Sequence, residues 1–187
     1  MIDFITNVDF SILDFIREHL SCGALDFLTP VLSKLGEWGA MWIVIAVVLL
    51  FFRRTRRCGV LMLITLAAGF LLGDLLIKPL VARVRPCNVR PYIEMIVDRP
   101  TSYSFPSGHA TAAFGAATAI FLNHKRWGIA ALVFALIVGF SRLYLYVHYP
   151  TDVLCGMLLG IGVAIAVYFI AKAVRPPKDL REGKHYA

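Results

Sequence analysis

Charged residues are scarce in this 187-residue sequence: Asp, Glu, Lys and Arg make up 17% of it, against about 25% in ordinary soluble domains. Hydrophobic residues reach 59%, and the mean hydropathy is +0.73. This composition excludes a soluble globule, a disordered chain and a nucleic-acid-binding arm. The length allows one domain, and the basic surplus of 19 Lys and Arg over 12 Asp and Glu favours a membrane and anionic substrates.

Other common features are also lacking. There are no internal repeats and no low-complexity segments. The cysteines form no CxxC pair and no zinc-site spacing, so we interpret them as small hydrophobic residues: Cys22, Cys58, Cys87 and Cys155. A removable signal peptide is not expected, because acidic residues interrupt the first twenty positions, namely Asp3, Asp9, Asp14 and Glu18.

Long apolar stretches dominate what is present. Each is close to the roughly 20 residues that cross a bilayer core, and flanking charged side chains can compensate for the shorter ones. The stretches are 38–52, 58–77, 102–122, 127–141 and 153–171. The pattern predicts an all-α polytopic membrane helix bundle with five spans, occupying 37–174.

In the first 36 residues the pattern predicts helices shorter than a full membrane span. Phe10, Leu13 and Ile16 recur at helical spacing opposite a charged face, which indicates an amphipathic helix in the membrane interface. The following apolar segment, 24–35, contains Pro30 and is too short to cross as a straight helix. It is either a half-helix against the bundle or part of a sixth span, so the side of the N-terminus stays open.

Basic residues predict the orientation of the bundle. When the five spans alternate, the arginine-rich turn 53–57, the turn 124–126 and the polar tail 175–187 fall on one side. Under the positive-inside rule that side is the cytoplasm. The segments 78–101 and 142–151 then face the extracytoplasmic side.

Two cations mark the outer end of the second apolar stretch. Lys78 and Arg85 are seven residues apart, close to two helical turns, so a helix that continues to Pro86 places both on one face. The simpler interpretation is that Lys and Arg merely flank a helix end. Both cations lie on the side that the positive-inside rule leaves poor in basic residues, which favours a functional pair.

The run 104–109 precedes an Ala-rich stretch. A serine cap, a proline in the first turn and the apolar residues that follow predict a helix N-terminus, where unpaired N–H groups attract anions. Gly108 lets an anion approach the backbone, and His109 stands just inside the helix. The alternative is an ordinary cap with His109 packed among helices.

A third cluster bridges the last two apolar stretches. Arg142 offers a planar fork to phosphate oxygens. Asp152 lies four residues after His148 and can accept a proton from one imidazole nitrogen while the other stays free as a nucleophile. Alternatively, Asp152 caps the last helix and His148 is a loop histidine.

Together the three clusters resemble the type-2 phosphatidic acid phosphatases, or lipid phosphate phosphatases, which share an active-site pattern with vanadium haloperoxidases. The matching motifs are 78–86 (KPLVARVRP), 106–109 (PSGH) and Ser141-Arg142 through His148 to Asp152. The resemblance covers about 58–171. It implies an integral membrane phosphatase that removes the terminal phosphate from lipid phosphates or isoprenoid diphosphates, such as phosphatidic acid, phosphatidylglycerol phosphate or undecaprenyl diphosphate.

The resemblance also implies residue roles. His148 attacks phosphorus to form a phosphohistidine, Asp152 orients His148, and His109 protonates the leaving oxygen and later activates water. The residues implied to hold the phosphate are Lys78, Arg85, Ser107, Gly108 and Arg142. No metal ion or other cofactor is then required, and no nucleic-acid partner is expected. With the charge pattern, this puts the site at the extracytoplasmic face of a plasma membrane, which the resemblance to the bacterial branch of the family implies is bacterial; the oligomeric state stays open.

Three alternatives belong to other classes. His109, His148 and Asp152 match a two-histidine, one-carboxylate metal site, although the neighbouring cations would repel a divalent ion. A small anion or lipid transporter would use the same basic cluster, but the chain lacks an internal inverted repeat, and its polar residues gather at one face. A haloperoxidase would need bound vanadate, and a membrane bundle fits a lipid-attached phosphate better.

Overall fold

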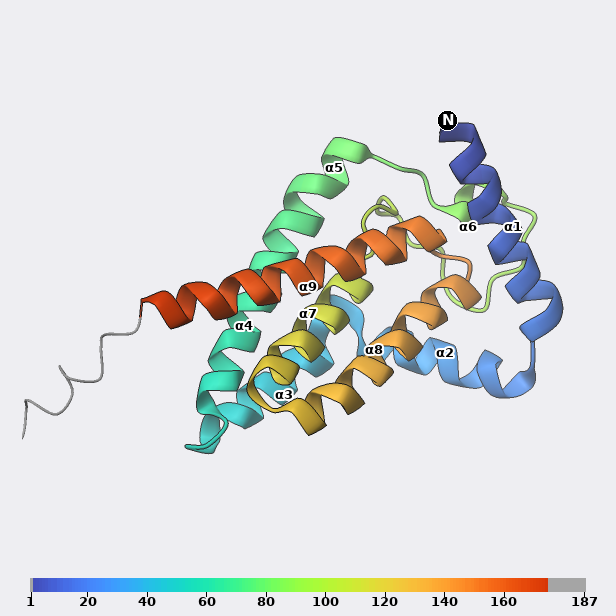
Figure 1. The fold of residues 1–187 in the computed structure, drawn as a ribbon. Helices are drawn as coiled ribbons and strands as arrows, with labels where there is room; N and C mark the ends of the chain where they lie inside the picture. The colour runs from blue at the N-terminus through green and yellow to red at the C-terminus, as the bar shows by residue number, and fades with distance from the viewer. Residues whose placement is uncertain (1, 175–187) are drawn as a thin grey trace, which may run out of the picture.

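The computed structural model describes residues 2–174, and within that range every regular element is a helix (Figure 1). This confirms the all-α prediction. The predicted polar tail, 175–187, lies outside the described residues. The elements are α1 (Ile2–Leu20), α2 (Gly23–Leu35), the 3-10 turn η1 (Glu37–Gly39), α3 (Ala40–Phe51), α4 (Arg56–Phe70), the π-helical η2 (Leu71–Ile77), α5 (Lys78–Val81), α6 (Pro86–Val89), α7 (Gly108–Asn123), α8 (Lys125–Tyr144) and α9 (Pro150–Ala173).

Length and hydropathy give three candidate membrane spans among residues 2–174, namely Arg56–Val89, Lys125–Tyr144 and Pro150–Ala173. A fourth is possible if α2 and α3, which meet at a 57° bend, form one broken span. The α7 helix has 16 residues, about 24 Å at 1.5 Å per residue, and is shorter than a bilayer core of about 30 Å. The fold is therefore a helical membrane bundle, whereas the count of five or six spans stays a prediction.

The α7 helix forms the centre of the bundle. It packs against α4, α8 and α9, and its residues from Ala110 to Ile120 are almost all buried. Two glycines of α9 allow the close approach: a Cβ at Gly156 would lie 2.6 Å from the Ser107 carbonyl oxygen, and one at Gly160 would lie 2.3 Å from the Thr111 carbonyl oxygen. These glycines thus let α9 pack closely against α7, and this packing positions the start of α7.

The N-terminal helix docks at one end of the bundle. In Figure 1, α1 (blue) stands beside the long connection that leads to α7 and beside the start of α9. Phe10, Leu13 and Ile16 are buried as the periodicity predicts. The opposite side of α1 is also apolar and exposed, with Val8, Ile12 and Phe15 on it. Its predicted place in the membrane interface stays a prediction.

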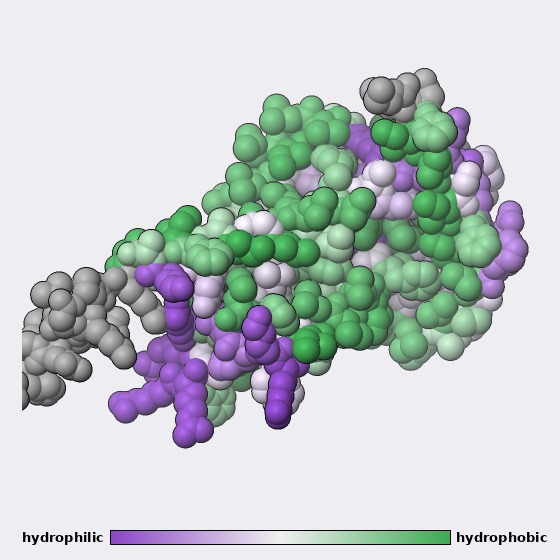
Figure 2. All heavy atoms as spheres, viewed as in Figure 1, coloured by the Kyte–Doolittle hydropathy of each residue, from purple (hydrophilic) through white to green (hydrophobic). Residues whose placement is uncertain are grey.

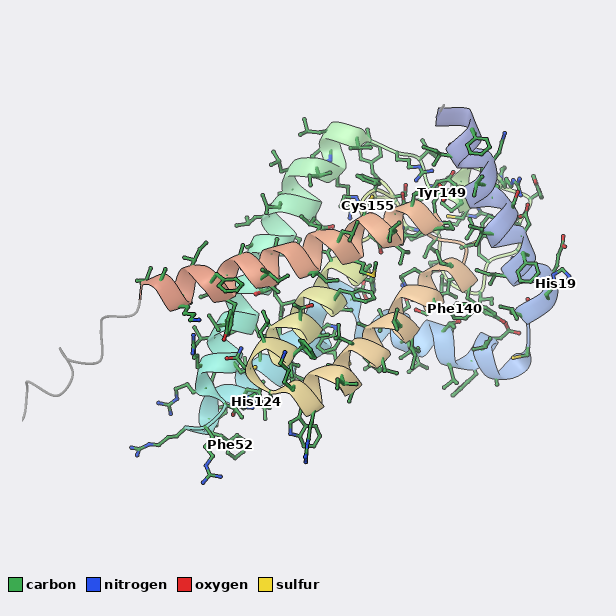
Figure 3. The ribbon with its side chains drawn as sticks, viewed as in Figure 1. His19, Phe52, His124, Phe140, Tyr149 and Cys155 are labelled. Carbon is green, nitrogen blue, oxygen red and sulfur yellow. The ribbon has the colours of Figure 1, made fainter. Side chains whose placement is uncertain are left out.

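The two basic turns lie at one end of the molecule. Thr55 and His124, one from each turn, line the same surface pocket. Figure 3 shows Phe52 and His124 close together at the end opposite Tyr149, and Figure 2 shows a cluster of hydrophilic residues at that tip, below a mostly apolar body. The chain therefore has a basic end and, at the start of α9, a second end where the three sequence motifs meet.

Candidate active site

A cavity of about 1110 Å³ opens at the second end. It brings together side chains from α5, from the connection before α6, from α7, from α8 and from the loop before α9. The predicted site residues that line it are Lys78, Arg85, Gly108, His109, Arg142 and His148. Asp152 lies behind His148, and Ser107 lies buried beneath Gly108.

His148 is held between Arg85 and Asp152. Its Nε2 lies 3.2 Å from Arg85 Nη1, and its Nδ1 lies 3.5 Å from Asp152 Oδ2. A guanidinium can only donate, so Nε2 accepts, and the proton of the neutral ring belongs on Nδ1, which faces the carboxylate. Among the described residues Nδ1 has no closer partner, so its contact with Asp152 is an approach rather than a complete hydrogen bond.

The charge state of His148 follows from its surroundings. The pKa of His148 is lowered to about 3, mainly because the ring is buried. The Arg85 cation lowers this pKa further, whereas Asp152 raises it. The ring is therefore neutral at physiological pH. A neutral imidazole with an unprotonated Nε2 is the form that can attack phosphorus, once the Nε2 lone pair leaves its hydrogen bond with Arg85.

Lys78 and Arg85 line the cavity together, but not from one helix face. The prediction of a helix continuing to Pro86 is wrong, because the chain leaves the helix at Ala82, whose φ is +48°. Arg85 is instead fixed by donating from Nε to the Ser102 carbonyl (2.7 Å) and from Nη1 to the Val147 carbonyl (2.8 Å). Lys78 forms an ion pair with Asp74, one turn earlier.

A serine caps the start of α7 as predicted, but the cap is Ser107, so Pro106 precedes the helix and the prediction of a proline in the first turn is wrong. Ser107 Oγ accepts from the Ala110 backbone N–H at 3.5 Å, and Ser107 is fully buried. The Ser107 side chain is thus engaged in capping α7, and its contact with phosphate stays a prediction. A Cβ at Gly108 would lie 3.0 Å from Asp74 Oδ2. The Asp74 carboxylate therefore lies over the helix N-terminus, where an anion is favoured.

The end of α2 closes the other side of the cavity. His109 Nε2 lies 3.1 Å from the Ser33 carbonyl oxygen, and Arg142 Nη1 donates to Ser33 Oγ at 2.9 Å. A Cβ at Gly36 would lie 2.9 Å from His109 Cδ2, so the glycine is what lets α2 pass so near. Arg142 is buried and also donates to Ser141 Oγ. One residue of α2 thus contacts two predicted site residues.

Sequence reasoning missed two residues that contact predicted site residues, Ser33 and Asp74. Asp74 carried a usable signal, because it precedes Lys78 by four residues and shares its helix face. Ser33 carried none, since its partners are distant in the sequence. Within residues 2–174 no three His, Cys, Asp or Glu side chains are grouped as metal ligands, so the alternative metal site is not assembled.

Comparisons with known proteins agree with the three motifs. An undecaprenyl-diphosphatase of Sulfolobus acidocaldarius is 36% identical over 141 residues, which cover 75% of this chain and 68% of that protein. Phosphatidylglycerophosphatase B of Bacillus subtilis is 35% identical over 161 residues, which cover 80% of this chain and 68% of that protein.

A solved structure extends the similarity to three dimensions. The crystal structure of a transmembrane PAP2 type phosphatidylglycerolphosphate phosphatase from Bacillus subtilis matches with a TM-score of 0.74 and 29% identity, covering 91% of this chain and 88% of that chain. Residues 58–176 match the sequence profile of the PAP2 superfamily, whose phosphatases are metal-independent hydrolases of phosphate monoesters or diphosphates. The predicted family is confirmed: this chain belongs to the PAP2 superfamily of membrane phosphatases.

Proposed function

We propose that this chain removes the terminal phosphate from a lipid phosphate or an isoprenoid diphosphate at the cavity, with His148 as the nucleophile. One observation carries the assignment: the neutral His148 Nε2 meets Arg85 in a cavity that Lys78 and Arg142 also line. The curated relatives, an undecaprenyl-diphosphatase and a phosphatidylglycerophosphatase, act on such substrates by their names.

The reaction has two steps. In the first, His148 Nε2 forms a bond to phosphorus while the bond to the lipid oxygen breaks, and His109 gives that oxygen a proton. In the second, His109 takes a proton from water, the water oxygen attacks phosphorus, and inorganic phosphate leaves His148. Cations around the equatorial oxygens stabilise the charge in both transition states. The cations assigned to this task are Lys78, Arg85 and Arg142.

The cavity also fits a substrate with a tail. Its wall next to α3 and α4 is apolar and includes Ile43, Leu63, Leu66 and Phe70. The cationic part binds the head group, and the apolar part receives the first carbons of a chain that stays in the bilayer. This shape favours a phosphate attached to an apolar chain, and measurements on several such lipids would identify the particular one.

The test is phosphate release by the purified protein across phosphatidic acid, phosphatidylglycerol phosphate and undecaprenyl diphosphate. We expect activity on at least one lipid, unchanged by a chelator and inhibited by vanadate, which mimics phosphate. Loss of activity in chelator, restored by a divalent metal, would contradict the metal-free mechanism. Failure on every lipid together with anion flux in proteoliposomes would favour a transporter.

We further propose that the cavity opens to the extracytoplasmic side, since both basic turns lie at the opposite end. Phe52→Cys and Tyr92→Cys, each in a background without the native cysteines, place exposed thiols at the two ends. In intact cells an impermeant thiol reagent should label the cysteine at position 92 and spare the one at 52. The reverse pattern would move the substrate pool to the cytoplasmic leaflet.

A further inference from the structure

A partly exposed guanidinium, that of Arg83, joins two buried carboxylates behind the active site. Arg83 Nη1 lies 2.7 Å from Asp152 Oδ1, and Arg83 Nη2 lies 2.7 Å from Asp9 Oδ2. The Asp152 and Asp9 side chains are 0% and 2% exposed. Buried charges are costly unless they are paired and hydrogen-bonded, and Arg83 pairs with both carboxylates here.

The carboxylate from α1 is tied to the first turn of α9 as well. Asp9 Oδ1 accepts from the Thr151 N–H at 3.1 Å, and Asp9 Oδ2 accepts from Thr151 Oγ1 at 2.6 Å. Arg83 Nη1 also donates to Thr151 Oγ1 at 2.7 Å. The three side chains form a closed network that fixes Arg83 against the residue preceding Asp152.

The network decides which way Asp152 faces. One of its oxygens, Oδ1, is taken by Arg83, and the other, Oδ2, accepts from the Tyr149 N–H at 2.9 Å and approaches His148 Nδ1. The Arg83 guanidinium also lies 3.8 Å from the centroid of the Tyr149 ring. Arg83 is absent from the lining of the cavity, so it acts on Asp152 and not on the phosphate.

We propose that Arg83 and Asp9 are positioning residues of the phosphatase reaction: they lock the Asp152 carboxylate toward His148. The inference rests on the proposed roles of His148 and Asp152. When His148 Nε2 bonds to phosphorus, the ring becomes cationic, and a carboxylate held at Nδ1 stabilises that charge. The amphipathic helix α1 thereby contributes to catalysis, although it lies outside the family motifs.

The chain offers a matched control. Arg90 lies in the same connection between η2 and α7, pairs with Asp14 of the same helix α1 at 2.8 Å, and lies 3.9 Å from the centroid of the Phe10 ring. It therefore fastens α1 much as Arg83 does, yet it does not contact Asp152. A loss specific to Arg83 cannot then be ascribed to loosening of α1.

The first experiment compares Arg83→Gln with Arg90→Gln in rapid-quench measurements of phosphoenzyme formation. We expect Arg83→Gln to slow phosphoenzyme formation about 30-fold with KM within about twofold, because transition-state orientation is lost and ground-state binding is kept. Arg90→Gln should change the rate by less than about threefold. Arg83→Lys should recover part of the rate, since it keeps one charge-assisted hydrogen bond. Equal rates in the two Gln variants would overturn the proposal.

The second experiment is a double-mutant cycle with Asp152→Asn. If Arg83 acts through Asp152, adding Arg83→Gln to Asp152→Asn should lower the rate of phosphoenzyme formation by less than about a further twofold. If the two residues act independently, the two rate losses should multiply. Multiplying effects would overturn the proposal. Should Arg83→Gln fail to fold, Asp9→Asn replaces it, with an expected loss of about fivefold in kcat and the same coupling to Asp152. Full activity of His148→Ala would instead contradict the proposed function itself.

Discussion

The two ends of the molecule are both rich in cations, and they use them differently. At the basic end Arg53, Arg54 and Arg126 are exposed to solvent. At the cavity end Arg85 and Arg142 are 6% and 2% exposed. Exposed arginines cost little to place and bias the orientation of a membrane protein, whereas buried ones need partners. Burial thus separates the charges predicted to set the topology from the charges that we assign to the reaction.

The partners make a second distinction within the cavity end. Arg83 and Arg90 bond to carboxylates and are neutralised by them. Within residues 2–174, Arg85 and Arg142 donate hydrogen bonds to carbonyls, to hydroxyls and to the His148 ring, and all of these acceptors are neutral. Their positive charge therefore stays available to the phosphate of the proposed substrate, which would supply the missing counter-charge.

The largest effect should separate two histidines at opposite ends. His148→Ala removes the nucleophile and should lower kcat by about 1,000-fold or more. His124→Ala, at the basic end, should leave kcat within about twofold of the unsubstituted protein's value. Phosphate release from the preferred lipid measures both. Near wild-type turnover of His148→Ala would show that another group attacks phosphorus.

The next effect should separate two arginines. Arg142→Gln removes a buried, un-neutralised charge from the cavity and should lower kcat/KM by about 100-fold. Arg126→Gln removes an exposed charge at the basic end and should leave kcat/KM within about twofold. Comparable losses in the two variants would mean that general surface charge, and not the buried cation, supports the reaction.

A smaller effect should come from the carboxylate that lies over Gly108. Asp74 pairs with Lys78 and lies where an anion would sit, so Asp74→Asn should tighten competitive inhibition by inorganic phosphate about fivefold. Asp98→Asn, at an exposed position on the rim of the same cavity, is the control and should change little. Weaker inhibition in Asp74→Asn would show that Asp74 orders Lys78 for phosphate and does not compete with it.

The smallest change is expected in a titration. Because the pKa of His148 is lowered to about 3, its ring should stay neutral as pH falls through 6.5, the ordinary value for histidine. The nucleophilic form is thus present above about pH 3, and His148 sets no acid limb of kcat/KM near neutrality. Nitrogen NMR of histidine-labelled protein, assigned with His148→Ala, checks this. Protonation of His148 near pH 6 would contradict it.

The sequence alone was sufficient to predict the part of the site that lies in its three motifs. Lys78, Gly108 and His148 line one cavity, as the alternation of the spans and the resemblance to a known family led us to expect, and their roles in the reaction stay predictions. Helix-face reasoning failed at Ala82, where a left-handed residue ends the helix without any proline or glycine at that position. The five-span count was not confirmed, since α7 is short and enclosed by other helices.

The contributions of α1 and α2 could not be predicted from periodicity. Asp9 reads as one of several acidic residues that interrupt an apolar segment, and Ser33 as a polar residue at a helix end. Their roles depend on partners at least 74 residues away, which no local pattern reports. Such contacts become visible only when the packing of α1 and α2 against the rest of the bundle is known.

The network around Asp9 also bears on the order of assembly during synthesis. The hydrogen bonds between Asp9 and Thr151 join residues 142 positions apart, and Tyr144 reaches back 118 positions to Asp26. Chains fold from the N-terminal side as they emerge, yet α1 and α2 must wait for α8 and α9 before their polar groups find partners. These polar contacts therefore close late, only after α8 and the start of α9 have been synthesised.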